Sequence, residues 1–250
     1  MRRRLLSLLF GTMCGLAAAA ETLPAYNTYQ TPPFVVEEGA GFAADVIDYL
    51  NANLKGQYQF QLIQLPRLRL NRIVTNVPDF KGVVLFLNPK FVGDLDKTKY
   101  FWTHAVMADA NKVISSSARK LEYNGPESLK GLRFGGVLGH RYDGLEEMFG
   151  KDVAREDVAS ESLNLIKVAL GRVDVTIMPH SSFRYLLKSL GADGPERGSL
   201  YISKKDHLQF DRHFFVAREN AALGHTLNQV IAGMKSDPAW KAILAKYGLD

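Results

Sequence analysis

The sequence predicts two α/β lobes, each with a mostly parallel sheet covered by helices on both faces. Stretches with the pattern of strands alternate with stretches of helical period along the whole chain. The strand–helix series starts afresh near residue 133, after a polar and loop-like stretch at 118–130. The 250 residues suffice for two lobes even when an N-terminal export segment is set aside.

The first series precedes the polar stretch. The residues at 57–65 alternate between apolar and polar side chains, which predicts an edge strand, whereas the continuous apolar run at 82–88 predicts a central strand. In chain order we expect a short strand at 22–26, a helix at 41–54, the edge strand at 57–65, a short helix opened by Pro66, the central strand at 82–88, and extended chain, a turn and a strand within 101–117.

The second series follows the polar stretch. Asp143 and Glu146 have the spacing of a capping box, and Asp237 before Pro238 has the pattern of a helix start. In chain order we expect a strand at 133–138, a helix at 143–149, a helix at 161–170, a strand at 173–178, a helix at 181–190, a strand at 212–217 and two closing helices.

The first 20 residues have the layout of a secretory signal peptide. Three arginines at 2–4 form a positive start, an uncharged apolar run follows, and alanines ending at Ala20 offer a cleavage site. The run is short for a membrane span, and a retained N-terminal anchor is the alternative. We therefore expect an exported chain that is cleaved near Ala20.

Cysteine content and charge exclude several classes of function. Cys14 is the only cysteine and lies inside the apolar run, so the chain from residue 21 has neither a disulfide framework nor a cysteine nucleophile. The formal net charge is +5, and the three N-terminal arginines supply 3 of it, which leaves +2 because residues 1–20 contain no acid. Such a small, scattered charge does not favour nucleic acid or an anionic membrane as the partner.

Four stretches resemble the extracellular solute-binding proteins of polar amino-acid transport systems, and they occur in the order of that family. They read TPPFVVEEGAGFAADVIDYLN, SLKGLRFGGVLGHRYDG, LIKVALGRVDVTIM and LNQVIAGMKSDPAWKAILAKYG. The resemblance implies the type II periplasmic-binding-protein fold, in which two α/β lobes are joined by two crossover segments around a ligand cleft. It places residues 21–108 and 209–250 in lobe one and residues 109–208 in lobe two.

The resemblance also implies a function and its partners. The expected protein is a periplasmic monomer that captures a small molecule by lobe closure and delivers it to a membrane ABC permease. It is not expected to be an enzyme, to bind nucleic acid, or to need a metal or another cofactor.

Candidate ligand residues of lobe one are chosen by residue type and by the positions that the resemblance aligns with the family's cleft. They are Tyr29, Thr31 and Phe34 after the first strand, Arg67 after the edge strand and Asn88 after the central strand. Each has a plainer alternative. The two aromatic residues fit the hydrophobic core, Arg67 fits the solvated face of a helix, and Asn88 fits a turn.

Candidate ligand residues of lobe two are His140, Arg141 and Tyr142, on the turn after the strand at 133–138, and His180 after the strand at 173–178. The turn may be read as part of a ligand cleft, as a phosphate loop or as an ordinary surface turn; it lacks the glycines, lysine and hydroxyl residue of a phosphate loop. Arg141 offers a planar cation that suits a carboxylate. His140 and His180 also raise the possibility of a metal pair.

Two positions depart from the family's α-amino-acid site. The family places an arginine for the ligand's α-carboxylate after the strand equivalent to 82–88, where this chain reads NPKFVGD. It also places an aspartate for the α-ammonium five residues after the equivalent of Asp174, where this chain has Pro179. We therefore expect a polar or carboxylate-bearing ligand other than a standard α-amino acid.

The second functional hypothesis is an exported enzyme on the same scaffold, similar to cyclohexadienyl dehydratase. It needs a carboxyl group in the cleft as a general acid, for which Glu37, Glu38 and Glu161 are candidates. A third hypothesis, the effector domain of a transcription regulator, fails because the chain begins with an export signal in place of a DNA-binding helix pair.

Overall fold

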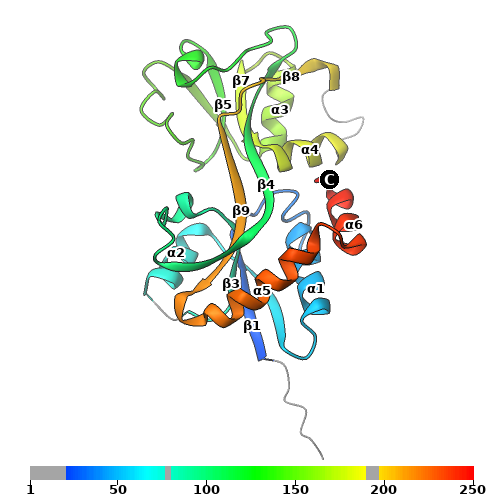
Figure 1. The fold of residues 1–250 in the computed structure, drawn as a ribbon. Helices are drawn as coiled ribbons and strands as arrows, with labels where there is room; N and C mark the ends of the chain where they lie inside the picture. Colours follow the sequence, from blue (N-terminus) through cyan, green and yellow to red (C-terminus); the bar gives the residue numbers. More distant parts are fainter. Residues whose placement is uncertain (1–20, 77–79, 190–196) are drawn as a thin grey trace, which may run out of the picture.

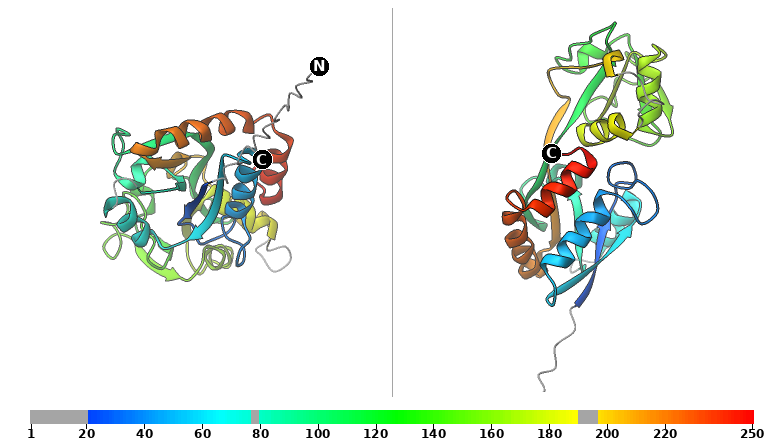
Figure 2. Two further views of the ribbon diagram at one scale, coloured as in Figure 1. Left: turned by 90° about the horizontal axis from the view of Figure 1, so that it is seen from below. Right: turned by 90° about the vertical axis from the view of Figure 1, so that its right-hand side faces the viewer.

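Two halves, each containing sheet and helices, lie one above the other and are joined by two long strands (Figure 1, Figure 2). The chain crosses along β4 (Tyr100–Ser116) and returns along β9 (Leu208–Ala217). The predicted signal peptide lies outside the residues that the computed structural model describes, which are 21–76, 80–189 and 197–250. We name the halves lobe one and lobe two. Their proposed boundaries at 108 and 208 fall within or beside the joining strands.

Lobe one consists of the chain that precedes β4 and the chain that follows β9. Its elements are β1 (Glu21–Asn27), α1 (Phe42–Asn53), β2 (Tyr58–Gln64), α2 (Arg67–Asn76), β3 (Val83–Leu87), the short 3-10 helix η1 (Pro89–Val92), η5 (Arg218–Asn220), α5 (Ala221–Met234) and α6 (Pro238–Tyr247). Lobe two is built between the crossings. Its elements are η2 (Pro126–Leu129), β5 (Arg133–Val137), β6 (Ala154–Val158), α3 (Glu161–Ala169), β7 (Val175–Pro179), α4 (His180–Ser189), η4 (Arg197–Ser199) and β8 (Leu200–Ile202).

Among the described residues, the strands form one hydrogen-bonded path in the order β2-β1-β3-β9-β4-β7-β5-β6, with β8 paired to β4. Strand β1 is parallel to β2 and β3, and β5 is parallel to β6 and β7. The two parallel groups are linked through antiparallel pairs made by β4 and β9. The expected α/β class is confirmed, and β2 lies at a sheet edge as its alternating residues predict.

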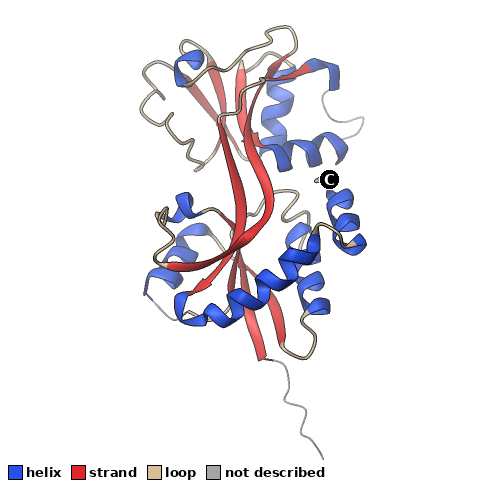
Figure 3. Cartoon of the chain, viewed as in Figure 1, coloured by secondary structure: helices blue, strands red, loops and turns tan. Residues whose placement is uncertain are grey.

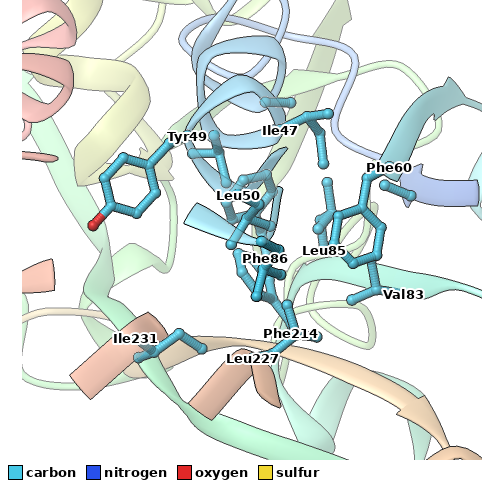
Figure 4. Close-up of a cluster of buried hydrophobic side chains, with 14 of the residues drawn as sticks. Ile47, Tyr49, Leu50, Phe60, Val83, Leu85, Phe86, Phe214, Leu227 and Ile231 are labelled. Carbon is cyan, nitrogen blue, oxygen red and sulfur yellow. The ribbon is translucent and has the colours of Figure 1, made fainter. Parts of the chain in front are cut away.

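Each lobe has its own hydrophobic core on both faces of its sheet. In lobe one, side chains of α1 and α5 cover one face (Figure 4), together with Trp240 and Tyr247 of α6. Leu70 and Val74 of α2 pack on the other face. In lobe two, α3 and α4 cover one face and the segment after β5 covers the other. Figure 3 shows the helices on both sides of the strands. Separate cores allow the lobes to act as two bodies joined by β4 and β9.

Strand β3 contains an irregularity that affects the surroundings of Arg212. Its pairing with β9 shifts register between Val84 and Leu87, and Phe86 has a φ of 61°. Regular alternation would place Phe86 with Val84, on the α2 face, but the bulge brings its ring into the opposite core beside Leu85. The same distortion turns the Phe86 carbonyl group toward β9, where it accepts a hydrogen bond from Arg212.

The turn that we expected within 101–117 is absent from the structure. The segment is one strand of 17 residues, with register shifts around Ala105 in its pairing with β9. The polar residues Thr103 and His104 lie at this irregularity. The bulged ladder lets one strand serve both lobes.

The expected helix at 143–149 is absent, and turns occupy the segment. Gly144 has a φ of 72°, which interrupts helical geometry directly after the expected start. Glu146 accepts a hydrogen bond from the backbone N–H of Tyr142 at 2.7 Å, so the acidic side chain still closes a local loop. Leu145 and Met148 are buried in the core of lobe two as a helix face would have been.

Strand β6 was not predicted, because its sequence AREDV is polar and it lies at the edge of the sheet. The start of α6 was predicted correctly. The Asp237 carboxylate accepts a hydrogen bond from the N–H of Ala239 at 2.8 Å, and Pro238 occupies the first helical position. Across the described parts of the chain, no helix has the length and apolar character that a membrane crossing requires.

Candidate functional site

The turns after β1, β3, β5 and β7 meet between the lobes. Lys90, after β3, pairs with Asp143, after β5, with 2.7 Å between Nζ and Oδ2. Ser182, in α4 after β7, donates from its hydroxyl to the carbonyl oxygen of Pro32, after β1, at 2.9 Å. Because each contact joins one lobe to the other, the carboxyl ends of the two parallel groups face a common region, where ligands of such sheets bind.

Three predicted residues follow β1. The rings of Tyr29 and Phe34 are stacked with their centroids 4.7 Å apart, and Thr31 forms the turn between them, its carbonyl oxygen accepting from the N–H of Phe34 at 3.1 Å. Phe34 is buried and Tyr29 is half-buried. Both rings cover the guanidinium group of Arg212, which lies 4.5 Å and 4.7 Å from their centroids.

Arg212 and Asp109 form a buried ion pair at the junction of the lobes. Arg212 lies in β9 and is 0% exposed; its Nε donates to Oδ2 of Asp109 in β4 at 2.8 Å, and Nη2 lies 2.7 Å from the same oxygen. Burial opposes the charge of Arg212, but Tyr29 and Asp109 hold its pKa above the usual value. The Asp109 carboxylate also accepts from the N–H and hydroxyl of Ser181 at 3.2 Å and 2.7 Å, at the N-terminus of α4.

Glu161 contributes a second buried carboxyl group to this junction, at the start of α3. Its Oε2 atom is buried and has no hydrogen-bond partner among the described residues. Burial raises the pKa of Glu161 to about 7, and Asp109 adds to the increase, whereas Ser182 and Arg212 oppose it. The protonated form therefore persists near neutral pH, which gives the junction a group able to donate a proton.

Arg67 and Asn88 flank the segment after β3. Arg67 is half-buried and donates to the carbonyl oxygen of Phe91 and to Oδ1 of Asn71; burial lowers its pKa. Asn88 caps η1 by accepting from the N–H of Lys90 at 3.0 Å and donates to the Asp211 carbonyl oxygen at 2.9 Å. The turn-forming alternative for Asn88 is therefore observed, and Arg67 is more enclosed than a solvated helix face requires.

The turn after β5 separates its three predicted residues. Arg141 is exposed, and no hydrogen bond or ion pair holds its side chain within the described chain. His140 is also exposed, although desolvation of its ring, which lies 4.8 Å from the Tyr142 ring, and the charge of Arg155 lower its pKa. Tyr142 is 3% exposed and packs on Phe134 in the core of lobe two, so in this conformation its ring does not reach a ligand.

His180 borders an interlobe cavity of about 470 Å³. The cavity lies along the middle of β4 and the start of β9, and its lining includes Asp109, Asp206 and Phe210. Burial, followed by the charge of Lys112, lowers the pKa of His180, which favours the neutral form of its ring. A larger groove of about 750 Å³ lies outside this region, between α1 and β2 of lobe one.

The possible metal site at His140 and His180 would need at least one further protein ligand. Within the described ranges, no group of three histidine, cysteine, aspartate or glutamate side chains is arranged to hold a metal ion.

Sequence reasoning missed Arg212 and Asp109. They are 103 residues apart in the chain, and strand pairing brings them together. The available signal was Arg212, two positions before the apolar run FFVA, because a charge in a buried strand needs a partner. Glu161 was one of three candidate general acids of the enzyme hypothesis, and its burial depends on packing that the sequence does not reveal.

No protein-family model matches the sequence, and no curated protein matches it in a sequence comparison. Solved structures do match. The GluR0 ligand-binding core from Nostoc punctiforme, in complex with L-glutamate, is 11% identical with a TM-score of 0.66, covering 91% of this chain and 100% of that chain. Holo ArgBP from T. maritima is 16% identical with a TM-score of 0.59, covering 91% of this chain and 96% of that chain.

A further match is the ancestral amino-acid-binding protein AncCDT-1, a precursor of cyclohexadienyl dehydratase. It is 14% identical with a TM-score of 0.63, covering 90% of this chain and 94% of that chain. The structural similarity establishes the fold of the chain, whereas sequence identities this low do not identify its ligand. The protein therefore has the type II periplasmic-binding-protein fold of amino-acid solute-binding proteins, which it matches over about 90% of its length.

Proposed function

We propose that this protein is a periplasmic solute-binding protein that captures a small carboxylate-bearing or otherwise polar molecule by closure of its two lobes. The observation that carries the proposal is the meeting of the turns after β1, β3, β5 and β7 at one interlobe region. The pairs Lys90–Asp143 and Ser182–Pro32 each join the two lobes across it. A ligand that contacts both sides stabilises the closed arrangement by its differential affinity for it.

Basic groups at this region favour an anionic ligand. Arg67 and Lys90 lie on the lobe-one side, and His140 and Arg141 lie on the lobe-two side. Arg141 is the strongest candidate for a carboxylate, because its exposed guanidinium group has no hydrogen bond or ion pair with the described residues that a ligand would have to displace. Tyr29 and His180 complete the proposed contacts with a partly exposed ring and a neutral imidazole.

A standard α-amino acid is a poor fit to the same region. The segment after β3 holds Asn88, Pro89 and Lys90 where a carboxylate-binding arginine is expected, and Pro179 replaces the expected aspartate. Proline has no carboxylate, so residue 179 itself offers no counter-charge to a ligand's ammonium group. We therefore propose an organic acid that lacks the α-ammonium group.

The proposed cellular role is to carry the bound molecule through the periplasm to a membrane transporter. A signal peptide at 1–20 would deliver the chain to the periplasm, and an ABC permease is the proposed recipient of the bound molecule. Both statements rest on the export pattern and on the scaffold.

The test is a thermal-shift screen over organic acids, aromatic acids, amino acids, polyamines and osmolytes. A ligand at 100 times its dissociation constant stabilises a protein by about 2.7 kcal/mol. We expect stabilisation by organic acids, and an affinity at least about tenfold lower in Arg141→Ala, equivalent to about 1.4 kcal/mol. Arg172→Ala is the matched control, because Arg172 is exposed in the same lobe just before β7, at the opposite end of that strand. Equal affinities in all three proteins for every stabilising compound would remove Arg141 from the site.

A second candidate function is an exported dehydratase-type enzyme, and the buried carboxyl group of Glu161 favours it. A pKa raised to about 7 suits a general acid at neutral pH. The same screen separates the two candidates. Each stabilising acid is incubated with the protein and analysed for product, and a binding protein returns the acid unchanged. Product that forms with the native protein and not with Glu161→Gln would establish the enzyme.

A further inference from the structure

The guanidinium group of Arg212 is enclosed in an aromatic cage, formed by Tyr29, Phe34 and Phe210. Its central carbon lies 4.5, 4.7 and 5.0 Å from the three ring centroids. Two rings come from the segment after β1 and the third from β9. Asp109 supplies the counter-ion through Oδ2, and the Phe86 carbonyl oxygen accepts from Nη1 at 3.3 Å. Arg212 is fully buried.

These are the components of a recognition site for an organic cation. Aromatic faces attract cations, and the attraction is larger in desolvated sites. A carboxylate in the same enclosure pairs with a guanidinium group through charge-assisted hydrogen bonds. The carboxylate is itself held in place, since Ser181 at the start of α4 donates to both of its oxygens. The side chains that form the cage and its counter-ion therefore come from β4, β9 and the segment after β1, and α4 holds the counter-ion in place.

We propose that Arg212 is a built-in occupant of a cation site at the interlobe region, and that its presence determines ligand class by denying this site to cationic molecules. The cage has the shape and charge for one alkylguanidinium group, and the chain supplies that group itself. A free cation entering the region meets a filled cage and the positive Arg212. The statement about ligand class rests on the proposed function, whereas the statement about the cage does not.

The first test uses the variant Arg212→Ala, in which the aromatic cage is left empty. This change removes the atoms from Cγ to the guanidinium group, which together match the heavy atoms of N-ethylguanidinium. The variant is expected to be less stable than the native protein, because Asp109 is left buried and unpaired. We expect N-ethylguanidinium to raise its unfolding midpoint selectively, while the neutral isostere N-ethylurea does not. The native protein should show no such selectivity, because its cage is filled.

The double variant Asp109→Asn with Arg212→Ala is the matched control. It keeps the vacated volume and the three rings but removes the counter-ion, so the selective response to N-ethylguanidinium should disappear. If Arg212→Ala is recovered only unfolded, the two probes are compared by refolding yield. Selective recovery with N-ethylguanidinium supports the cage. An absent response, or equal responses to both probes, contradicts it.

The second test addresses ligand class with agmatine, which carries an alkylguanidinium group on a longer stem. We expect no thermal shift of the native protein and a shift of Arg212→Ala. A shift of the native protein with agmatine as large as that of the variant would overturn the role of Arg212 in ligand class. A failed search for organic-acid ligands would weaken the proposed function and leave the comparison of N-ethylguanidinium with N-ethylurea unaffected.

Discussion

At the scale of the residue, the carboxyl group of Glu161 is buried, and one of its oxygens has no hydrogen-bond partner among the described residues. Ionising this group at high pH lowers the stability of the folded protein. Burial raises its pKa to about 7 in the folded protein, from an ordinary value near 4.5. Between these two values the folded state holds a proton that the unfolded state has lost. Stability contributed by this group is therefore fully present below about pH 4.5 and is lost as the pH rises to about 7.

Glu161→Gln removes this titration and should alter the pH dependence of stability. We expect the variant to gain about 2–3 kcal/mol relative to the native protein as the pH rises from 4.5 to 8, since one pKa unit corresponds to about 1.4 kcal/mol. Denaturant unfolding at several pH values measures the difference. Glu147→Gln, which changes an exposed carboxylate of the same lobe, is the control. A constant difference between Glu161→Gln and the native protein across this range would show that Glu161 ionises freely in the fold.

At the scale of the element, the entry into the long strand β4 is set by one buried carboxylate. Asp94 is 2% exposed and accepts hydrogen bonds from the N–H groups of Thr98 and Lys99 at 2.8 Å and 2.9 Å. Its second oxygen accepts from the indole N–H of Trp102 at 2.7 Å. These bonds outweigh burial and hold the pKa of Asp94 below its usual value. The carboxylate thereby ties the loop before β4 to the strand itself.

Asp94→Ala should cost about 2–4 kcal/mol, because it leaves the buried indole N–H of Trp102 and the backbone N–H groups of Thr98 and Lys99 without their acceptor. Asp96→Ala is the control, since Asp96 is exposed in the same loop. The stabilisation by Asp94 is present above the ordinary aspartate pKa and is lost as the pH falls through the lower folded value. Denaturant unfolding at pH 7 and pH 3 measures both effects. Equal stabilities of the two variants at pH 7 would contradict the structural role of Asp94.

Elements with a complete local signal were predictable from the sequence, and those decided by tertiary contacts were not. The apolar run of β3 and the cap and first proline of α6 identify their elements without reference to the rest of the chain. The segment at 143–149 has a helical apolar pattern, but Gly144 and the pairing of Asp143 with Lys90 lead to turns. Strand β6 is polar, and its pairing with β5 alone makes it a strand.

The candidate site divides in the same way. Residues on turns after strands were predictable, because the carboxyl ends of parallel strands define one edge of a sheet. Tyr142 was also assigned to the cleft, but its ring points into the core, which residue type and position do not reveal. Arg212 and Asp109 lie inside strands of opposite direction, and only the register of β4 with β9 brings them together.

At the scale of the whole molecule, the proposed function requires the lobes to move relative to each other. Their cores are separate, and β4 and β9 join them. Contacts on one side already link α4 to the C-terminal part, where Lys188 donates to the carbonyl oxygens of Ala245 and Lys246. Lys90 and Asp143 span the region between the turns after β3 and β5. Binding is expected to bias such contacts toward one closed arrangement.

Small-angle X-ray scattering with and without the organic acid that gives the largest thermal shift tests the central claim most directly. We predict that saturation decreases the radius of gyration of the native protein, because the lobes close on the bound molecule. The contradicting result is tight binding of that acid with an unchanged scattering curve, since a ligand held within one lobe has no need of closure.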